Sequence, residues 1–379
     1  MLTVDPILLK AFGEDHQPGW TAAAFYGPEE TVPDVPLTED GSITFSADGS
    51  VEAQGSVYLA RDVDYNGKSL VPKELTDPLA PNGQELELFR TVTVGEKLLG
   101  KVSLGRFRIT QVPDTVEYFR RWPSLDPSNP ANDRNIVVGW ACELKLEDRF
   151  ESIIADDFIE ATGPRAGNSC WAEMRRLSPY PIVVSLPDQD VPAGTSYSSR
   201  MDAIKTIAEI LGGAPSFTRE GALTVRERDT WMTADTPQFT IDGVISMNQG
   251  LSNDFVNQVQ VTSTLPGVKE VGTARITDLA DPLAVGRPIG GRTYKTSLPL
   301  KTKAQLDSAA AKLLRRLSTR QASTVTVRCP VRPDLDLGDF GLAIDPVTGR
   351  EVLGEIASMR FSMKPLADME ITMVAAVTR

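Results

Sequence analysis

The stretch "KVSLGRFRITQVPD", residues 101–114, decides how the fold is read. Apolar and polar residues alternate along it, which predicts a β-strand with one buried face. The apolar positions are Val102, Leu104, Phe107, Ile109 and Val112, and the alternation slips at Gly105. A glycine inside a strand weakens it, so it usually marks a bulge, a bend or a close approach of backbone. An equally alternating run lies within residues 136–150, and we expect it to form the neighbouring strand.

Length and composition predict a multidomain globular protein. At about 150 residues per domain, 379 residues suggest two or three domains. A hydrophobic content of 41% and a charged content of 24% are ordinary for a chain that builds packed cores. No segment reaches the roughly 18 apolar residues of a membrane span. The N-terminal stretch also lacks the features of a signal peptide, so we expect folding in a cytoplasm and no membrane insertion by this chain.

The charge argues against two classes of function. Lys and Arg total 39 and Asp and Glu total 51, a net charge of −12. Proteins that grip nucleic-acid phosphates cluster Lys and Arg, and docking on an anionic membrane needs the same residues. The tryptophans do not suggest a base-stacking platform either, because they are scattered without interleaved basic residues, at Trp122, Trp140, Trp171 and Trp231. We therefore expect passing DNA to meet no specific binding site.

Cysteine and histidine are too few for most catalytic or metal sites. The three cysteines, Cys142, Cys170 and Cys329, are far apart and odd in number, so we expect buried thiols and no disulfide framework. The single histidine, His16, cannot form a zinc site of paired histidines. Phosphate-binding glycine loops are absent from the sequence.

Two groups of carboxylates are candidates for the catalytic acids of a hydrolase. They are Asp334, Asp336 and Asp339 in "DLDLGDF", and Glu147, Asp148, Asp156 and Asp157 near residue 150. A glycosidase would need two acids facing each other across a groove, and sequence alone cannot pair them. A solvated strand face and a solvated helix flank explain these acids more simply. We therefore assign no catalytic, cofactor-binding or metal-binding residue, and expect no enzyme and no cofactor. A cell-wall hydrolase or a carbohydrate-binding β-protein remains the alternative.

The order of elements predicts a mainly β protein with a mixed α/β insertion. A short helix after Asp5 is followed by antiparallel strands up to residue 148. Helical spacing and a hairpin around Glu220-Gly221 then mark residues 149–237 as mixed α/β. Strands resume over 238–379, interrupted by one strong helix over 302–319 that begins with a capping box of Thr302 and Gln305.

Three stretches in this order resemble minor tail proteins of long-tailed bacteriophages, of the baseplate-hub or tail-tip class. The first stretch has a Pro-x-Gly turn, a strand ending in Arg, a Leu-Gly-x-aromatic-Arg-Ile strand and an Asp-Arg helix start. The matching residues are Pro81, Gly83, Arg90, Leu104, Gly105, Phe107, Arg108, Ile109, Asp148 and Arg149. The second is the helix and hairpin "SSRMDAIKTIAEILGG…FTREGALTV". The third comprises "NDFVNQVQVTS" and the segment from "DLDLGDF" to "MRFSM", whereas residues 270–300 match nothing in the family.

The resemblance implies a fold and an assembly. It implies two antiparallel β-barrels related to the tail tube, over 1–148 and 238–379, with the mixed segment 149–237 between them. It also implies a homotrimer whose six barrels join a sixfold tail tube to a threefold tip and line the DNA exit channel. The partners would be a distal tail protein or tube above and tip or receptor-binding proteins below. The location would be the virion tail tip, assembled in the host bacterial cytoplasm.

Two expectations follow from that reading. Gly105 would let its strand bend at a barrel corner, although an ordinary β-bulge in a sandwich explains the slip as well. The 22-residue connection 62–83 is longer than an internal loop needs to be, so we expect it to pack between protein chains. We further expect the pore wall to be acidic, because Lys and Arg there would retain DNA.

Overall fold

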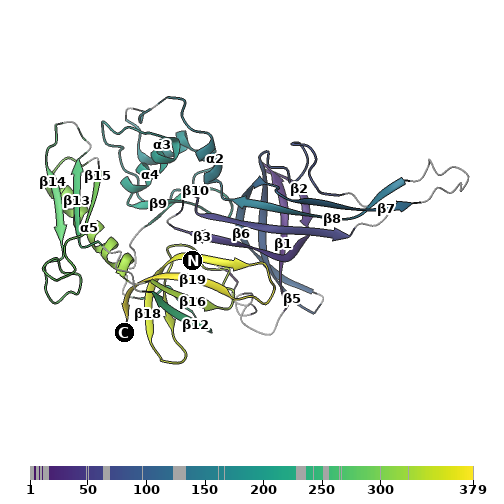
Figure 1. Cartoon of the computed structure of the whole chain (residues 1–379). Coiled ribbons are helices and arrows are strands. Elements are labelled where there is room, and N and C mark those ends of the chain that lie inside the picture. The colour runs from purple at the N-terminus through teal and green to yellow at the C-terminus, as the bar shows by residue number, and fades with distance from the viewer. Residues whose placement is uncertain are drawn as a thin grey trace, which may run out of the picture.

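A computed structural model describes most of the chain (Figure 1). The described residues are 17–47, 51–62, 69–95, 97–122, 134–160, 162–165, 167–227, 236–241, 243–250, 256–263, 267–298, 300–322 and 324–378, with a few single positions besides. The helix expected after Asp5 lies largely outside them, as do His16 and Trp231.

The fold is mainly β, as predicted. The N-terminal strands are β1 (Gln17–Tyr26), β2 (Glu29–Val35), β3 (Leu37–Ser46), β4 (Ala53–Asp62), β5 (Gln84–Val94), β6 (Lys97–Gln111), β7 (Thr115–Trp122) and β8 (Arg134–Glu147). The C-terminal strands are β11 (Phe239–Ile241), β12 (Ser246–Gly250), β13 (Gln258–Ser263), β14 (Val271–Arg275), β15 (Thr293–Leu298), β16 (Thr324–Cys329), β17 (Phe340–Ile344), β18 (Glu351–Ser362) and β19 (Met369–Thr378). Strand pairing is antiparallel except between β11 and β17 and between β13 and β15.

One large sheet runs through both β-rich regions. Its order is β12-β16-β19-β18-β3-β4-β8-β6-β5-β1-β2, and among the described residues this path is open at β12 and β2. The two regions meet where β18 pairs with β3, with Met359 opposite Phe45 and Phe361 opposite Ile43. The N-terminal and C-terminal β-rich regions are therefore joined directly by a pair of hydrogen-bonded strands, and not by a linker.

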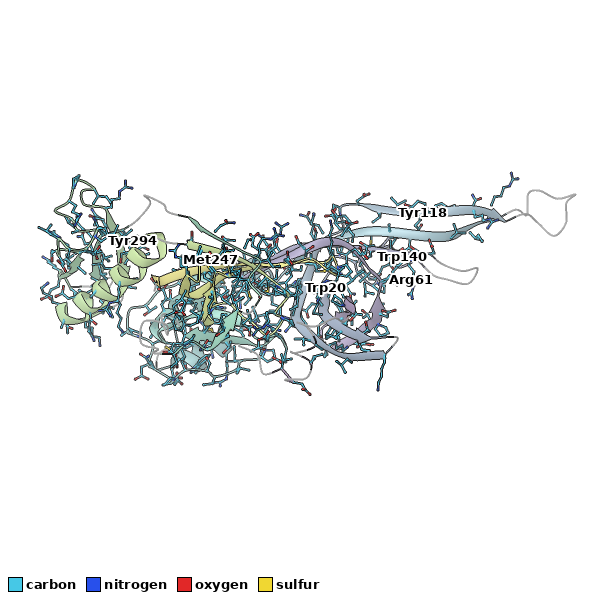
Figure 2. All side chains as sticks on the ribbon, turned by 90° about the horizontal axis from the view of Figure 1, so that it is seen from below. Trp20, Arg61, Tyr118, Trp140, Met247 and Tyr294 are labelled. Atoms are coloured by element: carbon cyan, nitrogen blue, oxygen red, sulfur yellow. The ribbon has the colours of Figure 1, made fainter. Side chains whose placement is uncertain are left out.

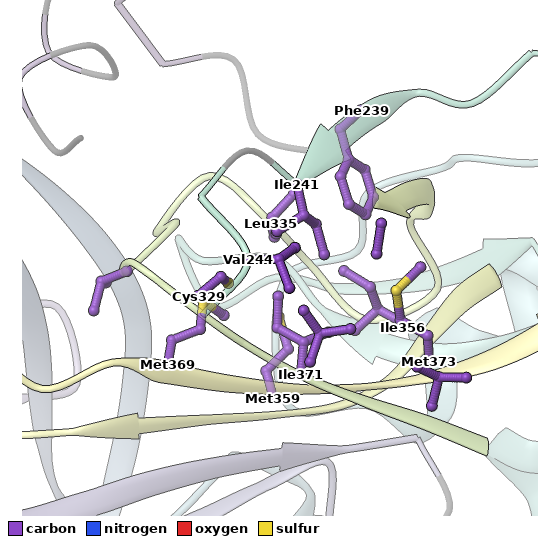
Figure 3. Packing of buried hydrophobic residues seen from close by; sticks show 14 of the residues in the cluster. Phe239, Ile241, Val244, Cys329, Leu335, Ile356, Met359, Met369, Ile371 and Met373 are labelled. Atoms are coloured by element: carbon purple, nitrogen blue, oxygen red, sulfur yellow. The ribbon is translucent and has the colours of Figure 1, made fainter. Parts of the chain in front are cut away.

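The two regions have separate hydrophobic cores that touch at this seam. Figure 3 shows the C-terminal core, in which Ile356, Met359 and Ile371 pack beneath Phe239 and Ile241. Phe45 and Trp20 pack against both cores. Phe45 meets the ring of Phe361 edge-on, at 5.8 Å between centroids. The seam is thus a packed aromatic contact as well as a row of backbone hydrogen bonds.

The phase slip at Gly105 is a β-bulge. On β5, Leu88 lies opposite Gly105 and Phe89 lies opposite Ser103, so Leu104 is the extra residue. Gly105 has φ = 120°, a conformation that side chains of L-residues rarely adopt. The bulge directs Leu104 into the C-terminal core and Phe107 into the N-terminal core. The glycine is therefore needed because one strand serves two cores, and the neighbour on its other edge is β8, as expected.

The middle of the chain contains the predicted helices and hairpin. They are α2 (Phe150–Ala155), α3 (Cys170–Leu177), α4 (Arg200–Ile210), β9 (Gly213–Phe217) and β10 (Leu223–Glu227). Ser199 caps α4 by accepting a hydrogen bond from the Asp202 amide. The three helices and the hairpin enclose a core of their own around Trp171 and Ile204.

A further small unit projects from the C-terminal region (Figure 1). The sheet β14-β13-β15 is separate from the large sheet, and helix α5 (Lys303–Ala322) packs on one of its faces. The predicted capping box is present, because the Gln305 amide donates to Thr302 Oγ1 and the Thr302 amide donates to Gln305 Oε1. The helix ends three residues beyond the predicted 302–319. Among the described helices, none is long and apolar enough to cross a membrane.

Candidate assembly surfaces

The β9–β10 hairpin locks the middle segment to both β-rich regions. Arg219, at the turn of the hairpin, donates two hydrogen bonds to Asp336 Oδ1, at 2.8 and 3.1 Å. It also donates to the backbone oxygens of Ser103, Pro333 and Leu335. Because Ser103 belongs to β6 and Asp336 to the C-terminal region, one side chain holds three parts of the fold together.

Arg149 makes the second lock at the start of the middle segment. It forms a bidentate pair with Glu85 of β5, donates to the carbonyl of Gly221, and lies 4.7 Å from the ring centre of Tyr180. Both charged side chains are buried, at 9% and 4% exposed. Gly221 has φ = 82°, and a Cβ there would overlap the guanidinium. The hairpin glycine therefore makes room for the arginine.

Between these locks lies a cavity of about 520 Å³. All three parts of the chain line it, including Glu52, Leu104, Ser216, Arg226 and Met359. Two of its charged groups pair with each other, because Glu52 accepts from Arg226 at 3.1 Å, and Glu52 also accepts from Ser216 Oγ at 2.8 Å. We interpret the cavity as a packing gap at a three-way junction.

Asp148 lies at the rim of this junction. It accepts hydrogen bonds from the amides of Ala53 and Phe150, at 2.8 and 2.9 Å. The latter bond holds the start of α2, whose N-cap residue is Arg149. Burial, with the nearby Glu52 carboxylate, raises the pKa of Asp148 to about 7. Its hydrogen bonds are to backbone on both sides of the junction, so its role is structural.

The carboxylates considered for hydrolysis are dispersed among structural contacts. Asp334 forms a bidentate pair with Arg332, Asp336 binds Arg219, and Asp339 accepts from the Asp336 amide. In the other group, Asp156 pairs with Arg200 and Asp157 accepts from the Arg200 amide. Glu147 lies on β8 opposite Arg108. Within the described residues, no cluster of three potential metal ligands occurs.

The cysteines are buried and free, as predicted for small apolar side chains. Burial raises the pKa of the Cys142 and Cys329 thiols to about 12, and that of Cys170 to about 11. They are therefore protonated at physiological pH and poor nucleophiles. Trp140 and Trp171 are buried core residues in two different clusters, so they form no stacking surface.

A two-stranded arm extends beyond the body (Figures 1 and 2). Strand β4 pairs with β8 only from Gly139 onward, whereas β7 pairs with β8 out to Trp122 and Arg134. Tyr118 and Phe119 on the arm are 56% and 60% exposed. An isolated two-stranded ribbon is marginal in water, and exposed aromatic side chains mark contact surfaces. The arm is therefore a candidate surface for another protein.

The connection after β4 is partly anchored to its own domain. Val71 and Leu79 are buried in the N-terminal core, and Lys73 pairs with Glu117 of β7 at 2.9 Å. Residues 63–68 of the connection lie outside the described residues. Contacts of this connection with another chain therefore remain a prediction.

Comparisons of the whole chain show what the fold is. The structure is similar to a tail protein from Neisseria meningitidis MC58, with a TM-score of 0.55 and 14% identity over 94% of this chain and 96% of that one. It is similar to the 43 kDa tail protein of prophage MuSo2 from Shewanella oneidensis, at 0.50 and 14% over 93% and 98%. A prophage tail protein from Listeria monocytogenes EGD-e matches at 0.51 and 10% over 95% and 94%.

The chain has the fold of phage tail proteins. No protein-family model and no curated protein sequence matches it. With identities this low, the tail-protein likeness rests on the order and packing of the elements. It extends over nearly the full length of each tail protein, so it covers both β-rich regions and the middle segment together.

Sequence reasoning missed the two arginine locks. In the sequence, Arg149 is recognisable only as part of a helix start, and no pattern distinguishes Arg219. The available signal was the hairpin "FTREGALTV", in which a basic residue precedes the Glu-Gly turn. The hydrogen-bond partners of Arg149 are 64 and 72 residues away in sequence and those of Arg219 are 114 or more away, so no local pattern could identify them.

Proposed function

We propose that this chain is a structural protein of a phage tail, namely the trimeric hub of the tail tip. The observation that carries the proposal is the full-length likeness to three tail proteins. In this role the trimer joins a sixfold tail tube to threefold tip components and lines the channel through which DNA leaves. Its neighbours are a distal tail protein or the tube on one side and tip or receptor-binding proteins on the other. Its place is the virion, after assembly in the bacterial cytoplasm.

The domains of the proposal are 1–148, 149–237 and 238–379. The first and last act as tube-like barrels, so that three chains present six of them around the channel. The β18–β3 seam supports this arrangement, because it fixes the two β-rich regions side by side in one sheet. The exposed arm of β7 and β8 supports contact with a neighbouring protein. The pore wall of the trimer carries more Asp and Glu than Lys and Arg, which keeps DNA from binding as it passes.

The proposed role requires no reaction. The described acids suggested as catalytic pairs contact arginines or backbone amides and support the fold. A structural role therefore fits them better than hydrolysis.

The mass of the purified protein in solution tests the proposal. A hub gives a particle of three times the 41.2 kDa chain mass by light scattering. The same preparation should leave the turbidity of purified cell wall unchanged. A stable monomer at every accessible concentration contradicts the trimer, and clearing of the cell-wall suspension contradicts the non-enzymatic role.

A further inference from the structure

The unit formed by residues 256–322, called the basic module below, has a charge opposite to that of the remaining chain. It comprises β13, β14, β15, α5 and their connections, with 11 Lys and Arg against four Asp and Glu. Its net charge is therefore +7. The whole chain has 39 basic and 51 acidic residues, so the rest carries 28 and 47, a net charge of −19.

One face of the basic module is covered and the other is open. Val259 and Val261 of β13 pack against Leu306 and Ala310 of α5, so that face is the core of the module. The alternate residues of the three strands form the opposite face, which is mostly polar: Gln258, Gln260, Thr262, Val271, Thr273, Arg275, Thr293, Lys295 and Ser297. This second face will be called the polar face.

Exposed basic side chains lie on the polar face and in the segments next to one end of the sheet. Arg275 and Lys295 project from the two outer strands and are exposed. Lys269 and Lys301, also exposed, lie in the segments next to the other end of the sheet. Val271 is the one apolar side chain among the residues of the polar face and is half-buried, so a partner would be held mainly by charge and hydrogen bonds. Such contacts contribute orientation and association rate more than affinity.

A complementary acidic surface occurs on the same chain. Residues 29–40, "EETVPDVPLTED", contain five acidic residues and no basic one. These acids are exposed, and they are Glu29, Glu30, Asp34, Glu39 and Asp40. Strand β2, which carries the first three, forms the open edge of the large sheet among the described strands. We call residues 29–40 the acidic edge.

The two charged surfaces lie on opposite sides of the molecule (Figure 1). The basic module is at the left of the view and β2 is to the right of centre, with the C-terminal region and the middle segment between them. One copy therefore cannot bring them together. In an assembly of identical chains, however, the polar face of one copy can meet the acidic edge of the next. Such a head-to-tail contact makes a closed ring when its rotation fits.

We propose that the polar face of the basic module binds the acidic edge of a second copy of this chain. The inference rests on the proposed function, since it assigns the charged contact between neighbouring subunits of the hub. Both surfaces are solvent-exposed in the single chain, so the attraction is screened by salt.

Charge reversal tests the contact. We expect the wild-type chain to form a trimer at about 50 mM salt. At about 500 mM salt it should associate more weakly, because the Debye length is far shorter. The double variant Arg275→Glu with Lys295→Glu places like charges together and should raise the dissociation constant by at least about tenfold. The matched control is Arg175→Glu with Lys205→Glu, which makes the same charge change at exposed positions on helices α3 and α4 of the middle segment, outside both surfaces. The control should assemble like the wild type.

A charge swap makes the test specific. Adding Glu29→Lys and Glu30→Lys to the first double variant should restore association, because the signs are then exchanged across the contact. Light scattering and sedimentation measure each outcome, and circular dichroism verifies that every variant is folded. Failure of the swap to restore a weakened trimer contradicts the acidic edge as the partner.

The remaining outcomes separate this inference from the proposed function. A wild-type trimer that the first double variant does not weaken overturns the contact and leaves the hub intact. A wild-type chain that stays monomeric at both salt concentrations contradicts the hub itself. Binding of a labelled DNA duplex, lost in the first double variant while trimerisation is unchanged, would show that the polar face binds phosphates instead.

Discussion

The arginines of the three-way junction and the basic residues of the module differ in their surroundings. Arg149 is buried and Arg219 is mostly buried, and their hydrogen bonds connect parts of one chain. Arg275 and Lys295 are exposed on an open sheet face. A buried charge without its partner is expensive, whereas an exposed charge is solvated by water. Basic side chains therefore stabilise the fold at the three-way junction, whereas those of the basic module are available to bind a partner.

Among the substitutions that test this difference, Arg149→Ala should have the largest effect on stability. The substitution leaves the buried Glu85 carboxylate without its bidentate partner, so we expect a loss of about 3–5 kcal/mol in the free energy of unfolding. Chemical denaturation followed by circular dichroism measures it. Replacing the pair together, with Arg149→Met and Glu85→Leu, should recover most of the loss. Equal losses in the single and double variants would mean that the ion pair is not the cause.

Arg219→Ala should have the next largest effect on stability. It removes the hydrogen bonds that tie the hairpin to β6 and to the C-terminal region, and we expect a loss of about 1.5–3 kcal/mol. Because Asp336 is 43% exposed, Asp336→Asn should cost clearly less. The same denaturation series compares the two variants. A larger loss in Asp336→Asn would place the stabilisation in the ion pair and not in the carbonyl contacts.

Gly105→Ala tests the strand that serves both cores. A Cβ at this position has space, since its nearest neighbour would be the tip of Phe107 at 3.8 Å. The cost is conformational, because φ = 120° is strained for alanine, and we expect about 1–3 kcal/mol. Thermal unfolding measures the change. An unchanged melting temperature would show that the bulge can move without loss.

The raised pKa of Asp148 predicts how the stability of the protein changes with pH. Its ordinary pKa of 3.8 is raised to about 7 in the fold, so the folded state binds the proton more tightly than the unfolded state. Its contribution to stability is therefore greatest below about pH 4 and is lost as the pH rises through about 7. Asp148→Asn should flatten the dependence of the unfolding free energy on pH across that range. Parallel pH profiles for the wild type and the variant would contradict it.

The smallest effect is expected in the basic module. Lys295→Ala should change the unfolding free energy of the monomer by less than about 0.5 kcal/mol, because the side chain is exposed. Its effect should appear in the salt dependence of assembly instead. Denaturation and light scattering on the same sample separate the two. A large loss of monomer stability would remove the contrast with Arg149.

Local patterns in the sequence were sufficient for several strands and helices and for the start of α5. Alternation predicted β6 and β8, and the capping box of Thr302 and Gln305 begins α5 as expected. The phase slip at Gly105 indicated either a strand bend at a barrel corner or a β-bulge, and the structure has the bulge. These features depend on residues that are neighbours along the chain, so the sequence contains the whole signal. The order of the elements also carried the resemblance to tail proteins.

Only the tertiary structure decided how the parts are joined. The β18–β3 seam pairs residues more than 300 positions apart, and the partners of Arg149 and Arg219 are distant in sequence as well. The charge of +7 over residues 256–322 can be counted in the sequence, but only the fold shows that these residues form a separate unit with an open face. Packing brings distant residues together and separates near ones, and the free energy of those contacts depends on burial that no local pattern records. The sequence by itself therefore determined the elements, whereas the fold determined the junction, the seam and the separation of charge.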